Sequence, residues 1–215
     1  MRLPFFYLCL CLCRTGLVIS MKKISALTVL HLVLMAAMVL GTVGGTVHFL
    51  VEFRKAAAGD ERLSNLANIF LMLAVLAMLI VGTLYLLMGY TKRAAVYYKL
   101  FLILNVAVCV LTILIDLCFY RVNTWMLIIS VLNACKIILL LLLACGKDLG
   151  EKKTWMLFYI LLAADGIKLV FAILNMISIG FDFSFAGYVT ALISDGTIGL
   201  AIRGKYENKK SRGRI

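Results

Sequence analysis

Four ionisable side chains fall in the middle of long apolar segments: Lys136, Asp165, Lys168 and Asp195. At a rise of 1.5 Å per helical residue, Asp165 lies about 15 Å from Trp155, near the centre of a bilayer core about 30 Å thick. A charged group at that depth costs about 2.5–3.5 kcal/mol on the insertion scale. We therefore expect these side chains to face one another, with Asp165 and Lys168 on one helix face at i, i+3 and Lys136 pairing with Asp195 across helices.

Two kinds of role fit such a cluster. One is a polar pocket or ion path, in which a carboxylate binds a cation or gains and loses a proton. The other is a neutral group of two Asp and two Lys that joins three helices. A water-accessible cavity reaching Asp165 or Asp195 favours the first role, and a dry, ion-paired cluster favours the second. With two amides at similar depth, the candidate ion-pathway residues are Asn105, Asn133, Lys136, Asp165, Lys168 and Asp195.

Small residues mark places where helices can approach closely. The first apolar run contains Ala37, Gly41 and Gly45 at four-residue spacing, which predicts a packing face within one copy or between two copies. Gly166 and Gly196 directly follow the two midplane aspartates and permit close packing or a local break. Pro4, the one proline of the chain, lies outside the apolar runs. Because transporter helices are often interrupted by Gly or Pro, this absence weakens the transporter interpretation.

The composition predicts which elements position these residues. The chain is 64% hydrophobic and 15% charged, whereas a soluble domain is roughly 45–50% apolar and 25% charged. Continuous apolar runs exclude a β-barrel, whose strands alternate. The expected fold is an all-α integral membrane protein, a bundle of six transmembrane helices with cytoplasmic N- and C-termini. The predicted spans are about 24–51, 66–90, 94–120, 124–145, 155–179 and 184–202.

The distribution of basic residues gives the expected orientation. Of the Lys and Arg other than Lys136 and Lys168, four fall on one side, at Arg54, Lys55, Arg62 and Arg121, and the other sixteen, including Lys99 near the start of its span, fall on the opposite side. The side rich in Lys and Arg is normally cytoplasmic. The chain then divides into an N-terminal segment 1–23, a six-helix domain 24–202 and a basic cytoplasmic tail 203–215.

The first twenty residues fit this plan poorly. The apolar stretch 3–13 is too short to span a bilayer, and Met21-Lys22-Lys23 before a long apolar run is typical of a natural start. We therefore expect translation to begin at Met21. Cys9, Cys11 and Cys13 lack the spacing of common zinc sites and have no His nearby, so no metal site is expected. His31 and His48 are expected to be packed or interfacial residues rather than ligands.

Several function classes are disfavoured. The sequence holds no nucleophile elbow, His-Glu-x-x-His or phosphate loop, so we expect neither an enzyme nor a cofactor. The formal charge of +12 is explained by the positive-inside rule, so nucleic acid is not an expected partner. The expected partners are the lipid bilayer, anionic lipid at the basic tail and a second copy through the first helix.

The sequence favours a small transporter or channel-like permease for an ion or small polar solute, located in the plasma membrane. The alternative is a non-transporting membrane interaction or assembly protein, whose midplane charges are structural salt bridges. The two differ in whether water reaches the buried aspartates.

Overall fold

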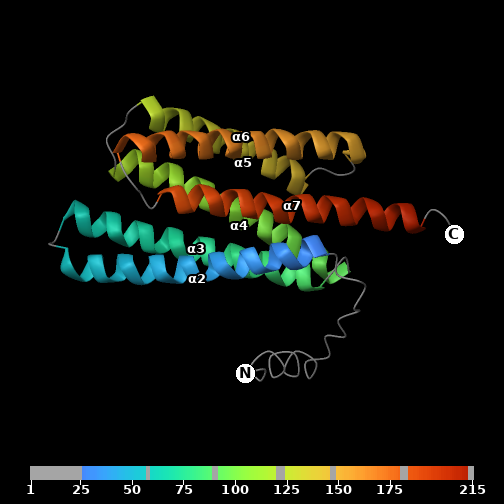
Figure 1. The fold of residues 1–215 in the computed structure, drawn as a ribbon, viewed down its shortest axis with the longest axis horizontal. Coiled ribbons are helices and arrows are strands. Elements are labelled where there is room, and N and C mark those ends of the chain that lie inside the picture. The colour runs from blue at the N-terminus through green and yellow to red at the C-terminus, as the bar shows by residue number, and fades with distance from the viewer. Residues whose placement is uncertain are drawn as a thin grey trace, which may run out of the picture.

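The structure is a computed structural model that describes residues 26–56, 59–88, 92–119, 124–145, 149–179 and 184–212. These residues form six helices (Figure 1): α2 (Ala26–Lys55), α3 (Asp60–Met88), α4 (Lys92–Phe119), α5 (Thr124–Cys145), α6 (Gly150–Ile179) and α7 (Ser184–Arg212). The expectations for a start at Met21 and for the three N-terminal cysteines lie outside the described residues.

All six helices are long and apolar enough to cross a membrane, which confirms the predicted all-α, multi-pass membrane fold. The helices run beyond the apolar segments. For example, α6 begins at Gly150, and α7 continues through Arg212 into the segment predicted to be a basic tail. Extending a helix that is already formed fixes few additional dihedral angles, and basic residues are favourable near a helix C-terminus.

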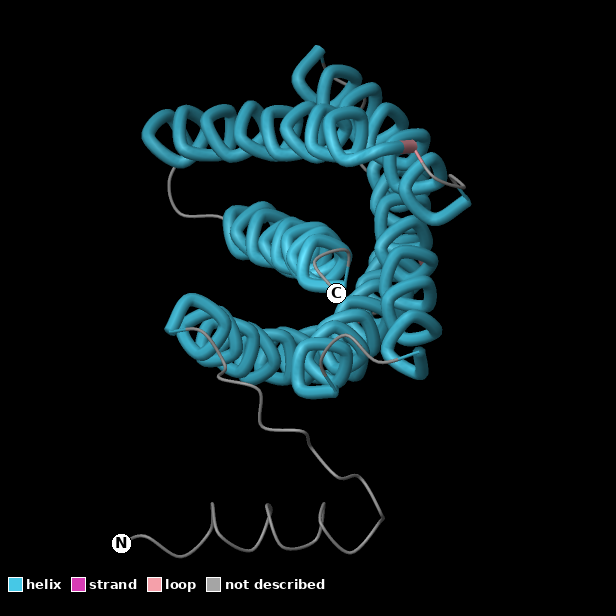
Figure 2. Tube along the Cα trace, turned by 90° about the vertical axis from the view of Figure 1, so that its right-hand side faces the viewer, coloured by secondary structure: helices cyan, strands magenta, loops and turns pink. Residues whose placement is uncertain are grey.

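The helices form an arc around one central member. Each packs against the next along the chain, and α7 also returns to contact α2 and α3. Viewed end on, α2 to α6 surround α7, and the arc is open between α2 and α6 (Figure 2). The apolar span of α7 is accordingly the most buried of the six, with 44% of an 18-residue stretch buried inside the bundle, against 17% for α2.

The sequence of α7 explains its central place. Thr190, Ser194 and Thr197 follow one another at four- and three-residue spacing, and all three are buried together with Asp195. Polar side chains at membrane depth are stable only where they face other protein groups. The apolar core packs around this helix through Met35, Met78, Phe101, Leu140, Leu161 and Ile198, which come from all six helices.

The bundle has two ends, which we name by the chain. The proximal end is where α2 begins and α7 ends, and the distal end is the opposite one. Both ends of the described chain lie at the proximal end (Figure 1), as an even number of spans requires.

Candidate functional site

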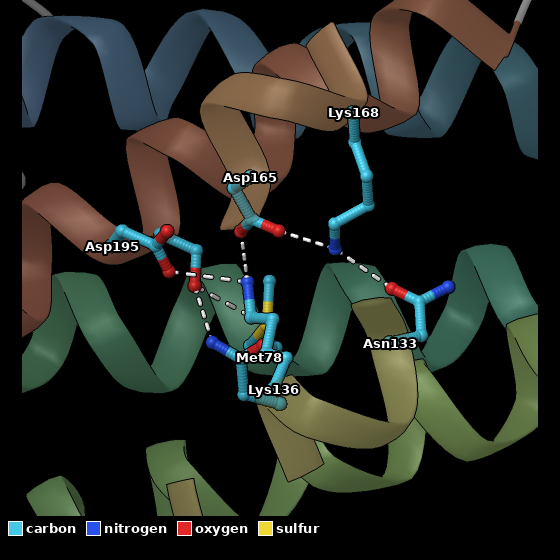
Figure 3. A network of polar contacts seen from close by, with 8 residues as sticks. Met78, Asn133, Lys136, Asp165, Lys168 and Asp195 are labelled. Carbon is cyan, nitrogen blue, oxygen red and sulfur yellow. Dashed lines mark hydrogen bonds and ion pairs between the residues drawn. The ribbon is translucent and has the colours of Figure 1, made fainter. Parts of the chain in front are cut away.

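A continuous chain of ion pairs crosses the interior of the bundle (Figure 3). Lys168 and Asp165, both on α6, pair with each other through Asp165 Oδ1. The second oxygen of Asp165 pairs with the ammonium group of Lys136 on α5. The same ammonium group lies 3.1 Å from Asp195 Oδ1 on α7. The sequence prediction that these four residues lie together therefore agrees with the structure.

An amide completes the chain at its α6 end. Lys168 Nζ donates a hydrogen bond of 2.8 Å to Asn133 Oδ1. Asn133 precedes Lys136 by three residues on α5, so the two side chains share a helix face. Two polar links therefore join α5 to α6, one through Asn133 and one through Lys136.

The cluster is fully buried and formally neutral in this conformation. The exposed fraction is 0% for Asp195, 1% for Lys136 and Asp165, and 2% for Lys168. Two ammonium groups face two carboxylates, so the formal charges cancel. Buried ion pairs are tolerated when their geometry is good and their remaining donors and acceptors are bonded. By the water-access criterion stated for the sequence, this conformation favours a structural role.

Two buried carboxylate oxygens of the cluster, Asp165 Oδ1 and Asp195 Oδ2, have no hydrogen-bond partner among the described residues. Asp165 Oδ1 is in an ion pair with Lys168, so only Asp195 Oδ2 has neither kind of contact in the described part of the chain. Every other carboxylate oxygen of the cluster takes part in an ion pair. A buried acceptor left without a donor costs about 1–3 kcal/mol. A proton or a cation that enters the cluster would therefore be stabilised most at this oxygen.

Polar contacts from other helices also converge on α7. Asn105 on α4 donates a hydrogen bond to Ser194 Oγ at 2.5 Å. The candidate Asn105 thus contacts the residue next to Asp195 and has no direct bond to the ionic chain. On the α2 side, His31 Nε2 and Thr197 Oγ1 lie 2.9 Å apart.

Ser194 and Thr197 were not among the residues singled out from the sequence. Their signal was present: polar side chains at regular helical spacing in an otherwise apolar span indicate a face turned towards protein. His31 is packed, as expected, and its hydrogen-bond partner is Thr197 on this polar face of α7.

The predicted small-residue face on α2 divides into two parts. Gly45 packs towards α3, where an added Cβ would lie 3.5 Å from Met72 Sδ. Ala37 and Gly41 are exposed, and no atom lies within 4 Å of a Cβ built at Gly41. Packing within one copy therefore accounts for Gly45 and not for the other two.

A scan against protein-family models, a search of curated proteins and a search of solved structures found no match.

Proposed function

We propose that this multi-pass membrane protein is a small permease that uses the cluster around Asp195 to move a proton or another small cation, alone or with a polar solute. The observation that carries the proposal is the buried, unpartnered Oδ2 of Asp195 beside an ammonium group shared with Asp165. Apolar residues of similar volume are often as stabilising as a buried ion pair. The presence of four midplane charges is therefore better explained by function than by stability.

The shared ammonium group gives the cluster two arrangements. A proton or cation on Asp195 neutralises that carboxylate and leaves Lys136 to pair with Asp165 alone. The ionic link between α5 and α7 is then broken, while the link between α5 and α6 remains. Because α7 is the central helix, releasing it changes its contacts with the surrounding arc. The conformation described here is the closed one, and transport requires a second conformation in which water reaches Asp195.

The test uses the full chain in liposomes that contain a pH-sensitive dye and carry an imposed membrane potential. We expect the wild type to carry protons inward and Asp195→Asn to abolish that flux, since the amide keeps the shape and lacks the charge. Asp116→Asn is the matched control, because Asp116 lies on α4 outside the cluster and is partly exposed. Equal flux through the wild type and Asp195→Asn overturns a proton pathway through this residue.

A different cation gives a different result in the same liposomes. If the dye reports no flux, the measurement is repeated with radioactive sodium and potassium ions. Uptake that depends on Asp195 supports a permease for that ion. Absence of all three fluxes, in vesicles shown to contain folded protein, contradicts the proposal for protons and for both ions.

The second candidate is the non-transporting interaction or assembly protein. The neutral charge balance and the exposure of 2% or less across the cluster favour it. In that case the ion pairs hold α5, α6 and α7 in one arrangement, and a partner binds elsewhere on the bundle. The stability of Asp195→Asn, measured beside the energetic coupling between Lys136 and Asp195, separates the two functions.

The expectations about location and partners belong to the same proposal. We place the protein in the plasma membrane with its proximal end in the cytoplasm, because basic residues are concentrated there. The basic tail contacts anionic lipid. The exposed Ala37 and Gly41 face of α2 pairs with a second copy. Neither an enzymatic activity nor a nucleic-acid partner is part of this proposal.

A further inference from the structure

A cavity of about 220 Å³ lies at the proximal end of the bundle, away from the charge cluster. Its walls come from α3 to α7 and from Leu149, which directly precedes α6. The lining residues include Tyr85, Ala94, Tyr98, Thr154, Ala201 and Lys205. Ala201 follows Asp195 by six residues, which is about 9 Å along the helix axis. The cavity is therefore a separate feature of the bundle.

Small side chains account for the unfilled space. Ala94 and Ala95, in the first turn of α4, and Ala201 on α7 all line the cavity. Protein interiors are normally packed without voids larger than a water molecule. Leu143 and Ile202 make the rest of this wall apolar. The interior of the cavity therefore suits a hydrocarbon group.

The rim of the cavity is polar and positively charged. Lys205 lines it, is exposed, and has no ion pair with an acidic residue in the described part of the chain. Thr154 lines it from α6, and the two residues before it, Lys152 and Lys153, are exposed. An exposed ammonium group on the wall of an apolar cavity, with two more lysines in the same turn as Thr154, complements a molecule with an anionic head and an apolar body.

We propose that this cavity is a binding site for an anionic phospholipid. The phosphate pairs with Lys205 at the rim, and a segment of one acyl chain enters the space between Ala94 and Ala201. An apolar cavity of about 150 Å³ holds benzene, so the space here holds part of a chain and not a whole lipid. This site differs from general attraction of lipid to the basic tail, because it requires both an apolar cavity and one particular lysine.

The two tryptophans of the chain provide a direct probe. Trp155 follows the cavity residue Thr154, whereas Trp125 lies at the distal start of α5. In the Trp125→Phe background, all tryptophan fluorescence comes from Trp155, which is next in the chain to a residue of the cavity. The protein is placed in vesicles of neutral phosphatidylcholine with increasing fractions of phosphatidylglycerol whose acyl chains carry bromine, which quenches tryptophan on contact. Brominated phosphatidylcholine is measured in parallel.

We expect brominated phosphatidylglycerol to quench Trp155 with saturation at a low lipid fraction, and brominated phosphatidylcholine to quench it only in proportion to its fraction. Lys205→Gln is expected to weaken the saturable component about fivefold, the factor that corresponds to about 1 kcal/mol per basic residue near an anionic surface. Ala201→Leu, which fills the cavity, is expected to abolish that component.

Matched variants on the same helix make the result specific. Arg203→Gln removes an exposed charge that does not line the cavity, and Ala186→Leu adds volume at an exposed position near the start of α7. Both are expected to bind as the wild type does. Equal quenching by the two lipids overturns the anionic site, and equal losses in Lys205→Gln and Arg203→Gln assign the effect to diffuse charge instead. Because Lys205 is exposed, its variant tests the proposal even if Ala201→Leu fails to fold.

Discussion

The imidazole ring of His31 occupies the space that a side chain at position 196 would need. A Cβ built on Gly196 would lie 2.6 Å from the ring carbon Cε1 and 3.0 Å from Nδ1. The opposite ring nitrogen lies 2.9 Å from Thr197 Oγ1. The absence of a side chain at Gly196 therefore lets α2 approach α7 closely enough for this polar contact, as expected from a glycine beside a midplane aspartate.

We predict that Gly196→Ala destabilises the protein. The added methyl group displaces the buried His31 ring, and overpacking of this kind costs about 1–3 kcal/mol. Thermal unfolding of the purified protein in detergent measures the effect. Gly166→Ala is the control, because nothing lies within 4 Å of a Cβ at Gly166 and alanine is the better helix former. An unfolding temperature for Gly196→Ala at or above that of Gly166→Ala would contradict the close packing of His31.

The ion-pair chain predicts an order of sensitivity between its two carboxylates. Asp165 pairs with two lysines, whereas Asp195 pairs with one. Asp165→Asn leaves Lys168 with the Asn133 oxygen as its remaining polar partner among the bonds described. We therefore expect Asp165→Asn to lower the unfolding temperature more than Asp195→Asn does. Thermal unfolding of the two single variants under the same conditions checks the order of their unfolding temperatures. The reverse order would mean that Asp195 contributes more to stability than Asp165 does.

Much of the cluster was predictable because depth and helix face follow from counting residues. The Asp165–Lys168 pair is fixed by i, i+3 spacing, and the pairing of Lys136 with Asp195 follows from equal depth. The bond between Lys136 and Asp165 was not predicted. It depends on the rotation of α5 relative to α6 about their axes, which packing of the whole bundle determines.

Counting residues along the chain does not predict that α7 is the central helix. Six apolar spans of similar length are compatible with a ring, a layer or an arc around one helix. The polar stripe of Thr190, Ser194 and Thr197 distinguishes α7 from the others, because each of these side chains needs a protein partner at membrane depth. That requirement explains why α2 and α4 direct His31 and Asn105 towards this helix.

The orientation of the bundle gives a third prediction. Reporter fusions at Lys92, at Lys147 and at the C-terminus are expected to read cytoplasmic, because most basic residues outside the spans lie on that side. A fusion in the connection between α2 and α3, after Lys55, is expected to read external and serves as the opposite control. An external signal at any of the three proximal positions would overturn the predicted orientation.

A double-mutant cycle on Lys136 and Asp195 gives the last prediction and separates the two candidate functions. Lys136→Ala leaves Asp195 without its ammonium partner at 3.1 Å, and an uncompensated buried charge typically costs about 3–5 kcal/mol. Yield of folded protein and unfolding temperature are measured for Lys136→Ala, Asp195→Ala and the double variant.

If the pair is purely structural, both single changes reduce stability and the double change recovers much of it, since removing both charges restores neutrality. That outcome, with a conservative Asp195→Asn variant that also unfolds readily, would contradict the permease. If Asp195 serves transport, Asp195→Asn keeps nearly full folding yield and loses flux.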